Sequence, residues 1–269
     1  MKVHFLGTAA FEGIPSMFCL CETCKQARQL GGPDIRTRTS VMIDDELKID
    51  FPPDTFYHSL REGLDMDSVR DILLTHSHSD HLYPEDMVIR AEGYASYGEH
   101  TIHVYGHDLP IRHISTLLSP EKHKFKLHAV RPFEPVLTQT ASVVPLLAEH
   151  NKQESCLLYY IEKGGKTVFY GHDSGWFPEA TWDWLVGKKL DMAILECTTG
   201  HAERCDDHMN VEDTLRTAQW LLANKIMKPG GRIIVTHFSH NANLLHDELK
   251  EIFEPHGMTV AYDGMIVEL

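Results

Sequence analysis

The segment at residues 73–84, LLTHSHSDHLYP, constrains this chain more than any other stretch. Four side chains that commonly bind metals crowd into six consecutive positions: His76, His78, Asp80 and His81. They follow a short apolar run, residues 71–74, that is typical of a buried strand. Alternate positions of an extended segment face one side, so His76 and His78 can share one point, while Asp80 and His81, past the bend, reach a second. Imidazoles and carboxylates together suit zinc, manganese or iron. A metal site at a strand end is therefore predicted, against the alternative of solvated residues at a helix start.

The rest of the chain alternates strand and helix patterns. Expected strands lie at residues 2–6, 41–43, 47–49, 102–105, 141–147, 157–162, 167–170, 192–196, 232–235, 259–261 and 265–267. Helical spacing is found at residues 84–97, 179–186, 211–224 and 244–253. Hairpins in each half with helices between them favour a mixed α/β sandwich. Because no linker divides the chain, we expect one domain over residues 1–269, with its seam near residues 132–135.

Charge limits the partners. The net charge is −14, from 25 Lys and Arg against 39 Asp and Glu. A surface this acidic disfavours binding to large nucleic acids, which needs basic patches. A small anionic substrate remains compatible, because bound cations dominate the local field. No apolar run reaches the roughly 18 residues needed to span a bilayer. The first residues carry too short an apolar stretch for a signal peptide. We therefore expect a cytoplasmic protein without a membrane partner.

The histidine loop is the signature of the metallo-β-lactamase superfamily, and this chain resembles it further downstream. His150 ends a strand pattern in VVPLLAEH, Asp173 in TVFYGHD and His237 in RIIVTH. The resemblance implies a four-layer αββα sandwich with two divalent ions, Mn or Zn, in the active site. It places His76, His78 and His150 on one ion. It places Asp80, His81 and His237 on the other, with Asp173 bridging both.

A cysteine cluster suggests a further metal. The stretch FCLCETCKQAR holds Cys19, Cys21 and Cys24, and three thiolates this close can wrap one structural zinc. A closed site needs a fourth ligand, and His240, three residues after His237, is the candidate. The alternative is three buried, inert thiols.

The combination of motifs is similar to the PhnP family of cyclic phosphodiesterases. The stretches FLGTAAFEGIPS, CLCETCKQAR, LLTHSHSDH, HDSG, DDHMN, VTHFSH and YDGMIVEL follow the family's order. The resemblance implies hydrolysis of small cyclic phosphodiesters, ribosyl 1,2-cyclic phosphates or 2′,3′-cyclic nucleotides, by a hydroxide that two metals activate, in phosphonate breakdown or nucleotide metabolism. The segments at residues 83–100 and 175–185 are expected to rim the pocket. A homodimer is compatible, although the sequence shows no interface signal.

Proton transfer is assigned to His208, in a polar loop just before a helix that Asn210 or Asp207 could cap. We predict His208 and Asp80 as catalytic residues, with Asp80 also a ligand. His201 competes with His208. His172 is interpreted as a structural residue or a support for a ligand.

Two further positions stay open or are set aside. Asp50 either orients a ligand histidine or is a turn residue at a strand end. Arg36 and Arg38 are interpreted as solvated side chains and are left out of the site.

Rival functions share the metal set. A ribonuclease Z-type endonuclease should carry a basic arm, which the sequence lacks. Lactonase, thioesterase or β-lactamase activity fits the cysteine cluster and the DDHMN loop less well. A flavodiiron protein would need a glutamate near Ser77 or His78. A non-catalytic PqqB-like relative would keep the cysteines with a degraded histidine loop, whereas this loop is intact.

Overall fold

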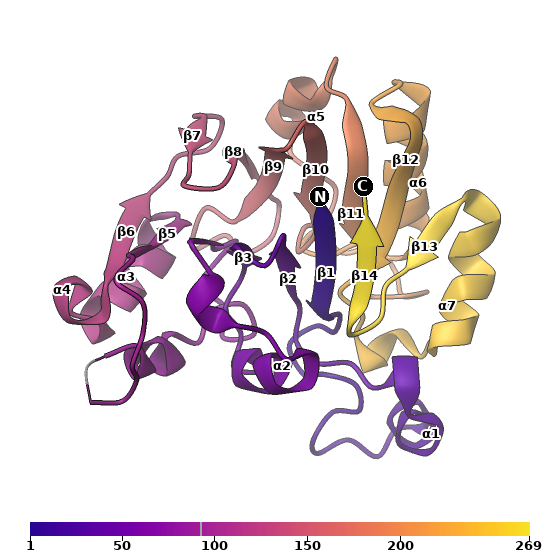
Figure 1. Ribbon diagram of the computed structural model, residues 1–269. Helices are drawn as coiled ribbons and strands as arrows, with labels where there is room; N and C mark the ends of the chain where they lie inside the picture. The colour runs from indigo at the N-terminus through magenta and orange to yellow at the C-terminus, as the bar shows by residue number, and fades with distance from the viewer. Residues whose placement is uncertain (92) are drawn as a thin grey trace.

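Two seven-stranded sheets pack face to face in the computed structural model, which describes residues 1–91 and 93–269 (Figure 1). The first sheet has the order β14-β1-β2-β3-β4-β5-β6. Its strands are β1 (Lys2–Gly7), β2 (Ser40–Ile43), β3 (Leu47–Ile49), β4 (Asp71–Leu73), β5 (Ile102–Gly106), β6 (Phe125–Ala129) and β14 (Met265–Glu268). The second sheet has the order β13-β12-β11-β10-β9-β8-β7. Its strands are β7 (Val136–Leu137), β8 (Ser142–Leu147), β9 (Leu157–Lys163), β10 (Lys166–Gly171), β11 (Leu190–Glu196), β12 (Met227–Thr236) and β13 (Met258–Val260).

Tight turns join the predicted hairpins. Three residues join β2 to β3, and the first two, Asp44 and Asp45, have φ of 50° and 60°, in the left-handed region. Gly164 and Gly165 form a two-residue turn between β9 and β10, and both have positive φ, as such turns require. The chain crosses from the first sheet to the second after β6, through residues 132–135, and returns to the first sheet with β14. The predicted seam therefore coincides with the change of sheet.

The helices are α1 (Glu22–Leu30), α2 (Thr55–Glu62), α3 (Asp108–Leu117), α4 (Pro120–His123), α5 (Glu179–Leu185), α6 (Val211–Ala223) and α7 (His246–Phe253). Of these, α3, α5, α6 and α7 pack on the outer faces of the sheets. One apolar cluster fills the space between the sheets, where Phe5 and Ile49 lie with Tyr159 and Ile194. A second packs the outer face of the first sheet against α3, and a third packs the second sheet against α5, α6 and α7. The predicted αββα sandwich is thus confirmed. Within the described ranges, no helix is both long and apolar enough to cross a membrane.

One predicted helix is wrong. Residues 84–97 form only a short 3₁₀ helix, Pro84–Ile89, and Glu92 lies outside the described residues. Gly93 has φ of 95°, which ends any regular helix there. Helices α1, α2, α3 and the four-residue α4 were not predicted. Each of the first three buries only a narrow stripe; α2, for example, buries Thr55 and His58.

Two hydrogen bonds tie the two sheets together beside the histidine loop. The hydroxyl of Tyr159 on β9 donates to the carbonyl of Leu74 at 2.7 Å. The amide of Leu157 donates to the carbonyl of Thr75 at 2.9 Å. The loop that follows β4 is therefore anchored to the opposite sheet at its first residues.

Candidate metal centre

The histidine loop leaves β4 and turns its side chains into the gap between the sheets. His76 and His81 are fully buried, and Asp80 is nearly so. The Nε2 atom of His81 lies 2.6 Å from Oδ2 of Asp173 and 3.3 Å from Oδ2 of Asp80. The Nε2 atom of His76 lies 3.5 Å from the same Asp173 oxygen. Both rings thus approach one carboxylate that comes from the other sheet.

The second sheet supplies residues at the ends of neighbouring strands. Strands β10, β11 and β12 are parallel, so their carboxyl ends meet at one edge, where Asp173, Glu196 and His237 lie. Asp173 and His237 have φ of 59° and 58°, a conformation that costs a residue with a side chain about 1–3 kcal/mol. The Nε2 atom of His237 lies 3.3 Å from Oδ1 of Asp173. Backbone strain is therefore concentrated where these side chains converge.

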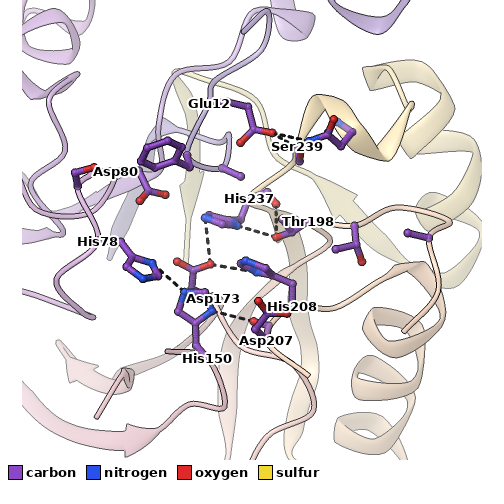
Figure 2. A pocket seen from close by; sticks show the side chains of 16 residues that line it. Glu12, His78, Asp80, His150, Asp173, Thr198, Asp207, His208, His237 and Ser239 are labelled. Atoms are coloured by element: carbon purple, nitrogen blue, oxygen red, sulfur yellow. Dashed lines mark hydrogen bonds and ion pairs between the residues drawn. The ribbon is translucent and has the colours of Figure 1, made fainter. Parts of the chain in front are cut away.

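All seven predicted ligands come together in two groups. The donor atoms within each group lie within 4.8 Å of one another; the groups are His76 with His78 and His150, and Asp80 with His81, Asp173 and His237. Oδ2 of Asp173 also approaches His76 of the first group, so this carboxylate lies between them. His78 offers Nδ1, which lies 3.1 Å from Nε2 of His150 (Figure 2).

The donor set fits divalent cations. Apart from their contacts with one another, several buried ligand atoms at this point have no hydrogen-bond partner among the described residues: Nε2 of His76, His81 and His237, and Oδ1 of Asp80 and Asp173. Buried polar atoms are rarely left without a partner. Imidazole and carboxylate are the ligands that zinc and manganese accept. Burial lowers the pKa of His81, but the charges of Asp80, Asp173 and Asp50 raise it well above its usual value. The strongly negative field that this shift reports would stabilise bound cations.

Hydrogen bonds behind the ligands fix their orientation. Nδ1 of His81 lies 2.7 Å from Oδ2 of Asp50, whose Oδ1 accepts from the amide of Thr75 at 2.8 Å. Nδ1 of His237 lies 2.8 Å from Oγ1 of Thr198. Asp50 has φ of 60° at the end of β3 and is fully buried. Of the two interpretations of Asp50, the structure supports orientation of a ligand histidine.

His208 reaches the same carboxylate from another side. Its Nδ1 lies 3.2 Å from both carboxylate oxygens of Glu196 and 3.4 Å from Oδ1 of Asp173. Burial lowers the pKa of His208, but Glu196 and then Asp173 raise it to about 10. Glu196 is fully buried and accepts hydrogen bonds from the amides of Ser174 and Met209. Sequence reasoning missed Glu196, although it ends a strand as Asp173 and His237 do.

An open cavity of about 580 Å³ lies over these residues (Figure 2). Its lining comprises Ala10, Phe11, Glu12, His78, Ser79, Asp80, His150, Asp173, Thr198, Thr199, Ala202, Asp207, His208, His237, Ser239 and Asn241. Cavities of this size hold small molecules.

The predicted rim at residues 83–100 and 175–185 is wrong for the described residues, because the loop after β1 and the loops at other strand ends form the wall. Helix α6 is capped by Asn210, whose Oδ1 accepts from Asp213.

The cysteine cluster is brought together with His240. Nδ1 of His240 lies 3.6 Å from Sγ of Cys19 and 3.5 Å from Sγ of Cys21. Cys24 completes a group whose donor atoms lie within 4.8 Å of one another. Tetrahedral zinc holds sulfur and nitrogen ligands about 3.5 Å apart. Burial raises the pKa of Cys21, but hydrogen bonds from Cys24, Cys19 and His240 lower it to about 6, which favours a thiolate. The set therefore fits a closed zinc site.

The remaining candidates lie outside both groups. His172 is buried, with its ring centroid 5.4 Å from that of His237, and supports the ligands by packing. His201 is exposed, and Arg38 pairs with Asp54. The interpretation of Arg36 as solvated is wrong. Arg36 is buried, donates to Thr8 at 2.7 Å, and stacks on the ring of Phe238.

Comparison with known proteins agrees with this geometry. Residues 50–238 match the family described as "Beta-lactamase superfamily domain". The chain therefore belongs to the metallo-β-lactamase superfamily and has the fold of its metal-dependent hydrolases. It is 27% identical over 190 residues to the probable metallo-hydrolase YhfI of Bacillus subtilis, covering 67% of this chain and 69% of that protein. A shorter match, 35% over 86 residues, is to an octanoyltransferase of Porphyromonas gingivalis; it covers 30% of this chain and only 16% of that protein.

Solved structures show the same fold over the whole chain. A diphosphatase from the PhnP family is 24% identical with a TM-score of 0.75, covering 100% of this chain and 97% of that one. Zn²⁺-bound PqqB from Methylobacterium extorquens is 18% identical with a TM-score of 0.78, covering 100% of both chains.

Proposed function

We propose that this protein is a phosphodiesterase that hydrolyses small cyclic phosphodiesters with the help of two divalent cations. The observation that carries the proposal is the position of His208. It is backed by Glu196 and borders the same cavity as both groups of candidate ligands. A third, structural zinc would be held by Cys19, Cys21, Cys24 and His240.

The two groups of candidate ligands would hold the two cations, and neighbouring side chains would orient the ligands. Each ion would have three or four protein ligands, with Asp173 shared, and would face the cavity. When bound, the cations supply positive charge for the phosphoryl oxygens and make water acidic enough to serve as a nucleophile at neutral pH. Asp50 and Thr198 each form a hydrogen bond with Nδ1 of a ligand histidine, His81 and His237 respectively. These bonds favour the tautomer in which Nε2 is left to bind an ion.

His208 would donate a proton to the oxygen of the leaving group. Its Nδ1 is engaged by Glu196, and Nε2 makes no hydrogen bond to any residue that the structure describes. As water attacks phosphorus, the bond from phosphorus to one sugar oxygen breaks. The proton on Nε2 passes to that oxygen and is replaced from the attacking water. The product is a phosphomonoester with a free hydroxyl, and no covalent intermediate is needed.

Phosphodiesters suit this arrangement better than carboxyl esters or long RNA. A protonated histidine beside the two ion positions offers a proton to an alkoxide leaving group and positive charge to an anionic centre. Against RNA, the net charge is −14, and the cavity lining includes no lysine or arginine among the described residues. Long polyanions would meet repulsion outside the metal site.

Elemental analysis of the purified protein, paired with hydrolysis of bis(p-nitrophenyl) phosphate, tests the proposal. We expect about three metals per chain and diesterase activity that a chelator removes and manganese restores. Nucleoside 2′,3′-cyclic phosphates and ribosyl 1,2-cyclic phosphates would then be compared as substrates. One zinc per chain and no activity with added manganese would refute the proposal and favour a role without catalysis.

A further inference from the structure

One wall of the cavity carries an acidic side chain that belongs to neither ligand group. Glu12 follows β1 in a loop, and Figure 2 shows it on a different wall from His208, with His237 between them. Its side chain is 23% exposed, so the carboxylate reaches the cavity without being free in solvent.

The carboxylate of Glu12 is held in place through one oxygen. Oε1 accepts from Oγ of Ser239 at 2.5 Å and from Nδ2 of Asn241 at 3.3 Å. The same atom lies 3.4 Å from Nε2 of His240. Oε2 has no partner among the residues that the structure describes. Glu12 therefore presents one fixed, charged acceptor to whatever enters the cavity.

The charges around the cavity are uneven. Apart from the candidate ligands, its acidic lining residues are Glu12 and Asp207, and the described lining has no lysine or arginine. The phosphodiester that reacts would be neutralised by the cations and His208. A second phosphate elsewhere on the substrate would have no such partner and would face Glu12.

We propose that Glu12 is a specificity-determining residue that selects cyclic phosphodiesters whose non-reacting end is uncharged. Oε2 accepts a hydrogen bond from a hydroxyl or amino group of that end and repels an additional phosphate. This inference rests on the proposed function and deepens it. The preferred class is a nucleoside 2′,3′-cyclic phosphate with a free 5′-hydroxyl, in preference to sugar cyclic phosphates that carry a second phosphate.

The test compares two substrates that differ at one position. The ratio of kcat/KM is measured for a nucleoside 2′,3′-cyclic phosphate with a 5′-hydroxyl and for the same compound with a 5′-phosphate. For the metal-loaded wild-type protein we expect a preference of about tenfold for the hydroxyl form. Glu12→Gln should remove most of the preference, because it keeps Oε1 as an acceptor and deletes the charge. Glu12→Asp should keep a preference, because it retains the charge.

Controls separate charge from folding. Glu179→Gln removes a charge from an exposed position outside the cavity and should leave the ratio unchanged. The metal content of Glu12→Gln shows whether the cysteine site has survived. Raising the ionic strength should shrink the wild-type preference and leave the ratio of Glu12→Gln nearly constant, because repulsion between charges is screened by salt. A purely structural role for Glu12 would not produce that difference.

Two results would overturn the inference. One is equal kcat/KM for both substrates in the wild type. The other is a wild-type preference that neither Glu12→Gln nor salt reduces. If the metal-loaded protein hydrolyses neither of the two substrates nor bis(p-nitrophenyl) phosphate, then both the proposed function and this inference are refuted.

Discussion

Nδ1 of His81 lies 2.7 Å from Oδ2 of Asp50, and both side chains are fully buried. The carboxylate holds a proton at Nδ1 and turns Nε2 toward Asp80 and Asp173, where it would bind an ion once that nitrogen is deprotonated. Asp50 adopts φ of 60° to reach this position. The arrangement is that of a ligand with a fixed tautomer, and it leads to the first prediction.

Replacement of Asp50 by Asn should weaken metal binding at the centre about 10–100-fold. The amide keeps the size of the side chain but no longer accepts the proton with a full charge. Competition with a chelator, followed by elemental analysis, measures the affinity. Asp71→Asn is the matched control, because Asp71 is equally buried and accepts from Thr140 away from the centre. Equal affinities for the two variants would contradict the role of Asp50.

Replacement of His208 by Ala should lower kcat about 10²–10⁴-fold while metal content is unchanged. The reason is loss of the proton donor on the cavity side. His201→Ala is the control, since His201 is exposed in the same loop. His208 also lies near His150 and Asp173. Loss of an active-site metal in the variant would therefore make His208 a ligand and remove it as the proton donor.

Replacement of Glu196 by Gln should move the alkaline limb of the kcat profile to lower pH. Burial lowers the pKa of His208, and Glu196 is the first of the groups that raise it. Without that charge the imidazolium loses its proton at lower pH, so the acid form is depleted sooner. Rates of both proteins measured from pH 6 to about pH 11, above the pKa of about 10, check this. If the alkaline limb of the kcat profile stays at the same pH in Glu196→Gln, then a group other than His208 causes that limb.

Replacement of Cys21 by Ser should remove about one metal per chain and lower the melting temperature. The same result is expected for His240→Ala, because Nδ1 of His240 faces two of the thiols. Cys156→Ser is the control, since Cys156 is a buried thiol outside the cluster. Unchanged zinc content and stability in His240→Ala would place His240 outside this site.

Lys48 gives a prediction about stability. It is fully buried, donates to Oγ of Ser40 at 2.6 Å, and has its pKa lowered to about 7 by burial, which the charge of Asp50 partly opposes. Between pH 7 and about 10 the unfolded chain binds more protons than the folded one, so the free energy of unfolding should rise with pH over that window.

Lys48→Met should flatten that dependence and increase stability near pH 7, as measured by urea unfolding at several pH values. Lys189→Met, at an exposed position, should do neither. If Lys48→Met leaves the slope of stability against pH intact, then the slope arises from other groups.

The ligand groups could be predicted from sequence because the histidine loop resembles the signature of the superfamily, and the resemblance implies the downstream ligands, each of which comes at the end of a strand pattern. Continuous apolar runs mark strands such as β8 and β10, and a polar residue within about three positions of the strand end lies at the sheet edge. His150, Asp173 and His237 follow this rule. Glu196 obeys it too, but sequence reasoning did not apply it to a glutamate that is not itself one of the predicted ligands.

The cavity wall could not be predicted, because it depends on contacts between distant parts of the chain. Glu12 meets Ser239, which is 227 positions away. Local patterns carry no signal for such a pair. The loop that holds Glu12 has no periodicity, and it is fixed by backbone bonds from Ala10 to Phe238 and from Phe238 to Thr8. The predicted rim failed for the same reason.

The centre takes its donors from both sheets: the loop after β4 provides His76, His78, Asp80 and His81, and the second sheet provides His150, Asp173 and His237. Ions bound there would act as cross-links between the two halves of the sandwich. Binding of the ions and packing of the two sheets against each other are then thermodynamically coupled, so a change that weakens one also weakens the other. A substitution at Tyr159, whose hydroxyl donates across the sheets to Leu74, would be measured as weaker metal binding although it touches no ligand.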